Sequence, residues 1–339
     1  MIYAHRFFQS FTGKMLAAVV ISGMCWLSAA NAQAVSALTF KLSNQFPPSH
    51  HISAGLVVFV EKVKEYSSGA ITVQLYDSGS LYRDAEILKA IRSGSVETGL
   101  VPVNKWSGLI PAVDIFDVPF TFKDLPAMKK FLDEAGSLFD KEFQKYGTNV
   151  LFWADYGYIQ FFNSKRPLKS PDDFKGLTLR SYSAGDAETV KALGAAPTII
   201  SSAEMYMSLQ RGTVDGANTG MPAAVSRKII EVQKYMTLAN YATAQFLVQA
   251  NLKWFNALNK EQQEIIMKAS KDAEAFIREK LNEAESEAEA TVRKAGVEIY
   301  VPTPAEREAF SKATNPVRED FLKKSGELGE QFVKIAEKI

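Results

Sequence analysis

The sequence predicts an α/β protein in which two α/β domains are spanned by one long helix. Strand-like and helix-like patterns alternate over residues 38–103, and a second alternating series occupies residues 163–220. Such alternation is typical of sheets covered by helices. The third observation is the stretch 259–295, which contains neither proline nor glycine and repeats apolar residues every three or four positions. It predicts one long amphipathic helix packed across both domains.

The N-terminal segment has the three parts of a secretory signal peptide. A basic start is followed by the apolar run MLAAVVISGMCWLSAA (15–30), and NAQA (31–34) offers small residues for cleavage after Ala34 or, alternatively, after Ala32. The apolar run is shorter than the roughly 20 residues that a spanning helix needs. A retained membrane anchor and a lipoprotein attached at Cys25 are the alternative interpretations.

The composition of residues 35–339 narrows the classes of function. Cys25 is the only cysteine, so the secreted chain is predicted to have neither a disulfide nor thiol chemistry. Outside the signal segment, 37 basic residues face 38 acidic ones. The chain therefore has no excess of positive charge that would indicate binding to nucleic acid or to an anionic membrane.

The elements of the first domain follow in order. We expect strands at 38–43, 70–76 and 96–103, with helices at 52–69 and 83–95 between them. This β-α-β-α-β order predicts a parallel sheet with right-handed crossovers. A loop at 111–122, a helix at about 125–145 and a strand at 149–154 come next.

The second series begins at a turn for which Ser170 is a suitable cap. Strands are predicted at 176–181 and 197–201, each followed by a helix, at 186–193 and at 201–212. Ser201 or Ser202 would cap the second of these helices. After the long helix, residues 298–308 predict a strand and the start of a helix, and a last amphipathic helix begins near residue 315.

The sequence offers no recognisable catalytic set. His50 and His51 are adjacent, which is not the spacing of a metal site, and no GxSxG, GxGxxG or GxxxxGK[ST] motif occurs. We therefore expect no catalytic residue, no metal and no cofactor. Two α/β domains behind a signal peptide favour a solute-binding protein that closes on its ligand like a hinge.

Several stretches carry a family resemblance. They are NSKRPL (163–168), DFKGLTLR (173–180), LGAAPT (193–198), SAEMYMSLQRGTVDG (202–216) and YMTL (235–238), with LYRDAEILKAIRSGSVETGL (81–100) and FDVPFTF (116–122) upstream. Together they resemble the DctP family, the extracytoplasmic receptors of tripartite ATP-independent periplasmic (TRAP) transporters. The resemblance covers essentially the whole chain after the signal segment.

The resemblance implies a periplasmic-binding-protein-like fold, in which hinge strands join the two domains. We expect domain I to comprise residues 35–156 plus about 245–284, and domain II to comprise residues 157–244 plus about 285–339. It also implies a periplasmic receptor that delivers a small carboxylate ligand to the small and large membrane subunits of the transporter.

In the family, an arginine that ends the GLKxR-type strand forms a salt bridge with the ligand carboxylate. Arg180 occupies this position, and its planar fork suits a carboxylate. The alternative interpretation from the residues alone is a structural ion pair with Asp186 or Glu188. Many relatives carry a second arginine where this chain has Ile159, so we expect a second cationic contact to be missing. Because Tyr156, Tyr158, Phe161 and Phe162 crowd this region, the hypothesis is a monocarboxylate with a bulky or aromatic body.

Further candidates for ligand contact are distributed along the chain. They are Asn218, Thr219, Tyr158, Trp106, Tyr241, Gln45 and Arg83. Arg83 is included because it would begin a helix, where the helix dipole disfavours a cation. Three other functions stay open at this point: a secreted lyase or hydrolase acting on an organic acid, a sensory binding subunit, and an ABC-type binding protein.

Overall fold

The computed structural model describes residues 35–339, so the predicted signal peptide lies outside the described residues. The strands are β1 (Leu38–Ser43), β2 (Ile71–Tyr76), β3 (Thr98–Pro102), β4 (Thr148–Asn163), β5 (Thr178–Ser181), β6 (Ala196–Ile199), β7 (Gly216–Thr219), β8 (Tyr235–Asn251) and β9 (Glu298–Tyr300). The α-helices are α1 (His51–Tyr66), α2 (Ile87–Ser93), α3 (Leu125–Lys145), α4 (Ala184–Ala192), α5 (Met205–Gln210), α6 (Met221–Ser226), α7 (Leu252–Ala257), α8 (Lys260–Lys294), α9 (Pro304–Ala313) and α10 (Asn315–Ala336). The 3-10 helices are η1 (Val103–Trp106), η2 (Pro111–Phe116), η3 (Pro171–Phe174) and η4 (Ile229–Glu231).

The strands of the described chain form one mixed sheet in the order β2-β1-β3-β8-β4-β7-β5-β6, with β9 paired to β8. β1 pairs in parallel with both β2 and β3, as the β-α-β-α-β order predicts. β3 then pairs antiparallel with β8. The expected parallel arrangement therefore holds within each strand group but not across the whole sheet.

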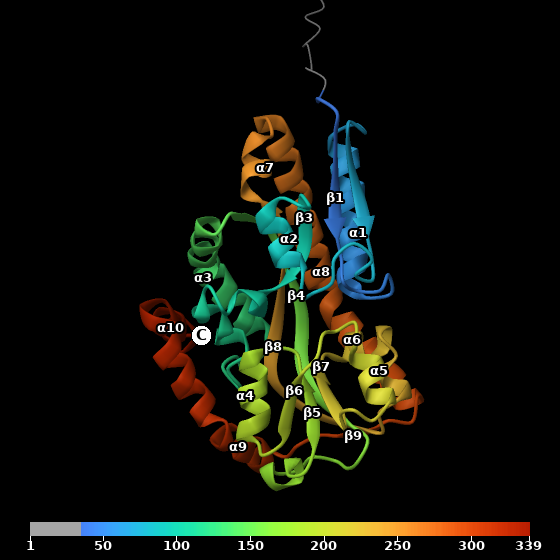
Figure 1. The fold of residues 1–339 in the computed structure, drawn as a ribbon, viewed down its shortest axis with the longest axis vertical. Coiled ribbons are helices and arrows are strands. Elements are labelled where there is room, and N and C mark those ends of the chain that lie inside the picture. Colours follow the sequence, from blue (N-terminus) through green and yellow to red (C-terminus); the bar gives the residue numbers. More distant parts are fainter. Residues whose placement is uncertain (1–34) are drawn as a thin grey trace, which may run out of the picture. The chain divides into compact units, whose positions relative to one another are not determined.

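Two long antiparallel strands, β4 and β8, form a ribbon that joins the two strand groups (Figure 1). The first strand group, β2-β1-β3, attaches along the end of the ribbon where Thr148 pairs with Asn251. The second strand group, β7-β5-β6, attaches at the other end, where Asn163 pairs with Tyr235. The ribbon has three register shifts, which bend and twist it between the two groups.

The long helix α8 is confirmed almost to the residue. A capping box between Asn259 and Gln262 starts it, and the buried residues of the helix follow the predicted apolar stripe. It packs against α1, β4 and α6, and so contacts both ends of the chain's sheet. None of the helices within residues 35–339 combines the length and the apolar character needed to cross a bilayer.

Several predicted elements differ from the structure. The strand predicted at 149–154 extends to Asn163, and the strands β7 and β8 were not predicted as strands. The helix predicted from 83 begins only at Ile87, so Arg83 does not begin a helix. The helix predicted from 201 begins at Met205, and its cap position has no side-chain hydrogen bond, so neither Ser201 nor Ser202 caps it.

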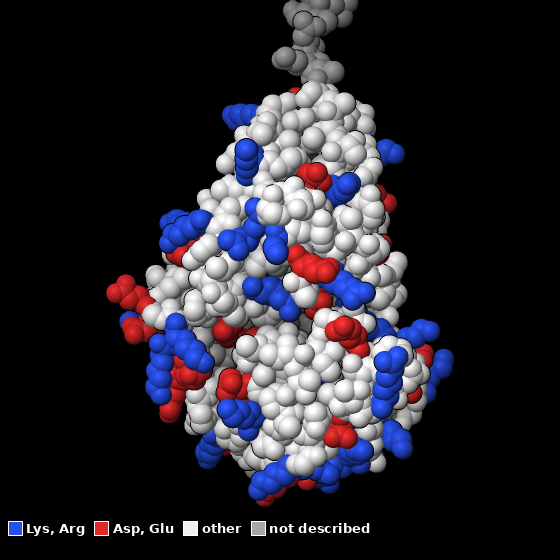
Figure 2. Space-filling view, viewed as in Figure 1, with Lys and Arg blue, Asp and Glu red and all other residues white. Residues whose placement is uncertain are grey.

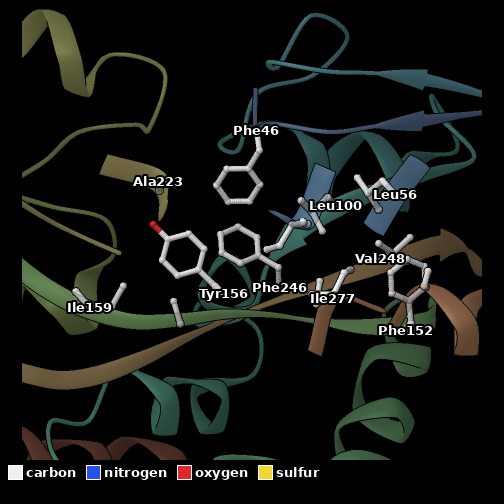
Figure 3. Packing of buried hydrophobic residues seen from close by; sticks show 14 of the residues in the cluster. Phe46, Leu56, Leu100, Phe152, Tyr156, Ile159, Ala223, Phe246, Val248 and Ile277 are labelled. Carbon is white, nitrogen blue, oxygen red and sulfur yellow. The ribbon is translucent and has the colours of Figure 1, made fainter. Parts of the chain in front are cut away.

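The core consists of buried apolar clusters on both faces of the sheet. Figure 3 shows part of the largest cluster, where Phe46, Tyr156 and Phe246 meet between the ribbon and the first strand group. The same three side chains line the cavity described next.

Candidate functional site

A cavity of about 40 Å³ lies between the two strand groups. The loops after β1, β3, β5 and β6 contribute to it Gln45, Asn104, Lys105, Tyr182 and Ser202. The strands themselves contribute Tyr156, Ile159, Arg180, Asn218, Thr219 and Gln245. The carboxyl ends of strands in an open α/β sheet are the usual place for a ligand site.

Arg180 is buried at the end of β5, with 2% of its surface exposed. Its Nε donates to the carbonyl of Ile200 at 2.9 Å, Nη1 donates to the carbonyl of Asn218 at 2.9 Å, and Nη2 donates to Oγ of Ser202 at 3.3 Å. A guanidinium has five N–H donors. Two of them are therefore left without a partner among residues 35–339.

Arg180 forms no ion pair within the described chain, which argues against the alternative interpretation of a structural ion pair with Asp186 or Glu188. Glu188 pairs instead with Lys191. Asp186 accepts hydrogen bonds from Nδ2 of Asn218 at 3.0 Å and from the hydroxyl of Tyr241 at 2.5 Å. Burial lowers the pKa of Arg180, and the nearby Asp186 carboxylate acts in the opposite direction. The guanidinium thus has a carboxylate close by, while its remaining donors are free for a ligand.

A second guanidinium lines the cavity, from Arg227 after α6. Its Nη2 donates to the carbonyl of Gln45 at 3.0 Å, and its Nη1 donates to the carbonyl of Ser202 at 3.4 Å. The guanidinium carbon lies 5.2 Å from the ring centre of Phe46, within cation–π distance. A second guanidinium therefore lines the cavity, and its contact with a ligand stays a prediction. Ile159 does line the cavity in place of the family's arginine, but Arg227 supplies the charge from another element.

Three aromatic side chains form one wall of the cavity (Figure 3). The rings of Phe46 and Phe246 are 5.1 Å apart, and those of Tyr156 and Phe246 are 5.2 Å apart. The Tyr156 hydroxyl is held at 2.9 Å from Oγ1 of Thr219 and accepts a hydrogen bond from the amide of Gly220. The wall is therefore apolar and has a fixed geometry.

Charged side chains surround the cavity. Arg180, Arg227 and Lys105 carry positive charge, and Asp84 is the acidic residue that lines the same space. On the molecular surface, Lys and Arg side chains gather around a hollow midway along the face in Figure 2, with acidic side chains among them. The cavity is therefore suited to an anion.

Hydrogen bonds connect the two sides of the cavity. Asp117, just after η2, accepts hydrogen bonds from Oγ of Ser183 at 2.6 Å and from the hydroxyl of Tyr182 at 3.1 Å. Asp84, just before α2, accepts from the amide of Ser202 at 3.2 Å. With the Arg227–Gln45 contact, these bonds hold the first strand group's loops against those of the second.

The structure brings four of the eight residues selected from the sequence into the cavity. They are Arg180, Asn218, Thr219 and Gln45. It places the other four outside. Trp106 is fully buried in the core and donates to Oε1 of Gln249 at 3.1 Å. Tyr241 is buried with its hydroxyl on Asp186, so it supports the site through that carboxylate.

Tyr158 and Arg83 are the other two residues outside the cavity. The hydroxyl of Tyr158 accepts a hydrogen bond from the amide of Leu125 at 2.9 Å, on the side of β4 away from the cavity. Arg83 is exposed and lies at a shallow depression beyond Asp84.

Sequence reasoning missed Arg227, Lys105 and Asp84 as cavity residues, whereas Tyr156 belongs to the aromatic group that the sequence placed near the site. Lys105 lies shortly after strand β3, and Asp84 lies shortly before helix α2. Their position at the edge of the sheet, where ligands usually bind, could have identified them as candidates. Arg227 follows the six-residue helix α6, which was not predicted. The sequence around Arg227 has no periodic pattern that would indicate where its side chain points.

Comparisons with known proteins show the family to which the chain belongs. Residues 42–325 match the family model DctP, described as bacterial extracellular solute-binding protein, family 7. The C4-dicarboxylate-binding periplasmic protein DctP of Rhodobacter capsulatus is 28% identical over 320 residues, which cover 93% of this chain and 96% of that protein. The 2,3-diketo-L-gulonate-binding periplasmic protein YiaO of Escherichia coli (strain K12) is 29% identical over 309 residues, covering 90% and 93%.

Solved structures share the fold. A TRAP periplasmic solute-binding protein from Sulfitobacter sp. NAS-14.1, with bound β-D-galacturonate, superposes with a TM-score of 0.84 at 27% identity. The match covers 89% of this chain and 100% of that one.

Proposed function

Because the chain belongs to family 7 of the bacterial extracellular solute-binding proteins, we propose that it captures an organic acid through Arg180 and delivers it to the small and large membrane subunits of a TRAP transporter. The two relatives are named as periplasmic binding proteins, and we extend that property to this chain, which we propose is a receptor and not an enzyme. Residues 1–34 would then be the cleaved signal peptide.

One observation carries this proposal: the guanidinium of Arg180 is buried and has no ion-pair partner in the described chain. Burial of Arg180 is costly, and the nearby Asp186 carboxylate offsets this cost only in part, since the pKa of Arg180 stays lowered. The three hydrogen bonds to Ile200, Asn218 and Ser202 fix the plane of the guanidinium. The two free N–H groups of a fixed fork match a carboxylate.

The ligand that we propose is a monocarboxylate with a bulky or aromatic body. Three cations line the cavity, while Asp84 lines it and Asp186 lies near Arg180, so the balance is one positive charge. A single carboxylate neutralises it. The aromatic wall of Phe46, Tyr156 and Phe246 offers an apolar surface for the remainder of the ligand.

A small dicarboxylate is the second candidate, and the position of Arg227 favours it. If the negative charge of Asp84 is neutralised by another group, the positive charge of Arg227 is available to bind a second carboxylate. The relatives do not decide between the two, since one is named for C4-dicarboxylates and another for 2,3-diketo-L-gulonate.

We further propose that capture closes the two α/β domains predicted from the sequence, with the β4–β8 ribbon as the hinge. The Asp117–Ser183, Asp84–Ser202 and Arg227–Gln45 contacts would then belong to the closed state. A ligand whose carboxylate binds Arg180 and which also contacts the loops after β1 and β3 would make more contacts in the closed state than in the open state. It would therefore stabilise the closed state.

The test is a thermal-shift screen of purified residues 35–339 against monocarboxylates and dicarboxylates of matched size. A tight ligand raises apparent stability by mass action. We expect stabilisation by bulky monocarboxylates and little response to succinate. Stabilisation by small dicarboxylates alone would reject the monocarboxylate and favour the second candidate, and conversion of an added acid into a product would support the enzyme alternative.

A further inference from the structure

A buried carboxyl group lies where the loops of the two strand groups meet, outside the ligand cavity. It belongs to Asp117, which follows η2 and is 3% exposed. A Cβ on Gly185, in the first turn of α4, would lie 2.9 Å from Cβ of Asp117, so the two elements are in direct contact. Val317 and Phe321 of α10 line the small cavity beside this contact. Elements from both sides therefore withdraw Asp117 from water.

The hydrogen bonds to Asp117 come from neutral groups. Oγ of Ser183 donates to its Oδ2 at 2.6 Å, and the hydroxyl of Tyr182 donates to its Oδ1 at 3.1 Å. Oγ of Ser183 also accepts from the amide of Asp186 at 2.9 Å, as the cap of α4. No Lys, Arg or His within residues 35–339 forms an ion pair with Asp117. Because a buried charge without such a partner is costly, the carboxyl group is expected to hold a proton.

The other ionisable groups around Asp117 oppose a second negative charge there. Carboxyl groups come from each helical element packed against it: Asp114 of η2, Asp186 and Glu188 of α4, and Asp320 of α10. Lys324 of α10 lines the same small cavity, but its Nζ pairs with the carboxylate of Asp320 at 2.5 Å. Tyr182 and, from β8, Tyr241 are the neutral titratable groups close to Asp117. The surroundings therefore favour the neutral form of Asp117.

The proton affinity of Asp117 depends on the contact between the two sides. In this contact, burial raises the pKa of Asp117 to about 8, Asp114 and Asp186 add to the effect, and the hydrogen bonds from Ser183 and Tyr182 act against it. In the open form proposed above, Asp117 would lose both hydrogen bonds and return to water, where an aspartate has a pKa near 3.8. Between these two values, the closed form holds a proton that the open form releases.

We propose that closure of the protein on an acid takes up one proton at Asp117, so that capture is coupled to pH. This inference rests on the proposed function, since it needs capture to close the two sides, and it adds a group outside the ligand cavity. The stabilisation of the closed form by Asp117 is complete below pH 3.8 and is lost as the pH rises through about 8. The protein therefore captures its acid more tightly in acidic surroundings than in alkaline ones.

Isothermal titration calorimetry on residues 35–339 measures the proton directly. The probes are phenylacetate, succinate and D-galacturonate, which are all ionised at pH 7.5 and so bring no proton with them. Titrations at pH 7.5 in buffers of different ionisation enthalpy give the number of protons taken up per acid bound. We expect about 0.5–1 proton, and an affinity that falls about 10-fold or more from pH 6.5 to pH 9. These two values come from the unsubstituted chain.

Asp117→Asn tests the assignment to this residue. The amide has the shape of the protonated carboxyl group but does not titrate. We expect this variant to take up no proton, to keep one affinity across the pH range, and to bind more tightly than the parent protein at pH 9. Asp140→Asn is the matched control, because burial also raises the pKa of Asp140, to about 6, but this residue lies on α3 and outside the contact. The control should follow the parent protein.

The outcomes separate this inference from the proposed function. Binding of a probe without proton uptake by the parent protein, at an affinity that does not change with pH, would overturn the coupling and leave capture through Arg180 intact. Uptake that persists in Asp117→Asn would assign the proton to another group, such as Asp186, and overturn the role of Asp117. Failure of all three probes to bind would count against capture of an acid itself, and the coupling would fall with it.

Discussion

At the scale of single residues, the cavity depends on two arginines that differ in how they are held. Arg180 is fixed entirely by groups of the second half of the chain, Ile200, Asn218 and Ser202. Arg227 instead reaches across, to the carbonyl of Gln45 and the ring of Phe46. We therefore propose that Arg180 is positioned before closure, whereas Arg227 would complete its contact with Gln45 only when the two sides meet.

This difference predicts the effect of replacing Arg227. Arg227→Met keeps the length of the side chain but removes the charge and both hydrogen bonds, so we expect ligand binding to weaken by about 1–3 kcal/mol. Calorimetry with the best acid from the screen measures the change. Arg211→Met is the control, because Arg211 is exposed and lies outside the cavity. Unaltered affinity in Arg227→Met would restrict Arg227 to a surface role.

Residue-level prediction from the sequence succeeded where the family resemblance singled out a short segment. Arg180, Asn218 and Thr219 lie at or near the end of a strand, and the structure puts all three in the cavity. Trp106, in η1, and Tyr241, within β8, show the limit, because an aromatic side chain can turn into the core when it finds a polar partner there. Gln249 and Asp186 are those partners, and both come from distant parts of the chain.

At the scale of elements, the contact between α8 and the ribbon contains an unusual carboxyl group. Both oxygens of Glu285 are buried without a partner, and the helix presents them to Gly157 of β4. Gly157 has a φ of +108° and follows a register shift in the ribbon, and a Cβ there would lie 2.2 Å from Oε1 of Glu285. Position 157 therefore requires glycine for two reasons: its backbone has a positive φ, and a Cβ would clash with Glu285.

Burial raises the pKa of Glu285 to about 8, with Glu289 adding to the effect. The folded protein therefore binds this proton more tightly than the unfolded chain, whose glutamate has a pKa near 4.5. The stabilisation is complete below pH 4.5 and is lost as the pH rises through about 8.

We expect Glu285→Gln to remain stable as the pH rises, and at pH 9 to exceed the parent protein in free energy of unfolding by a few kcal/mol, on the order of 1.4 kcal/mol per pKa unit. Urea unfolding between pH 5 and 9 measures this. Glu279→Gln, on an exposed face of the same helix, is the control. Identical pH profiles for the parent protein and Glu285→Gln would show that Glu285 titrates normally.

Helices and strands were predicted correctly where their local sequence pattern was strong, and they were missed where it was weak. α3 and α8 are long and amphipathic, and their predicted bounds agree with the structure. β8 was missed although it is the longest strand, because it is buried on both faces and lacks an alternating pattern. β7 has only four residues and follows a turn-like VDG sequence, so its pairing with β4 and β5 is a tertiary effect.

At the scale of the whole molecule, one sheet carries both strand groups, and we propose that its central ribbon is the hinge. The two strand groups are joined mainly through β4 and β8, whose register shifts lie between Val150 and Phe161. The contacts across the cavity are few and polar, with Asp117, Asp84 and Arg227 as their main members. Such an interface is suited to opening and closing.

Ligand binding is therefore predicted to make the protein more compact in solution. Small-angle X-ray scattering of residues 35–339 should show a smaller radius of gyration when a saturating acid is added. Arg180→Ala should keep the larger value at the same acid concentration. An unchanged radius of gyration in the parent protein at proven saturation would contradict hinge closure.

The central claim is that the Arg180 guanidinium holds the carboxylate of the ligand, and calorimetry of Arg180→Ala with the best acid of the screen tests it most directly. Arg211→Ala serves as the control. The account predicts that Arg180→Ala loses about 2–5 kcal/mol of binding free energy, because a buried charge pair loses one partner, while Arg211→Ala binds as the parent protein does. Equal affinity in the parent protein and Arg180→Ala would contradict the account.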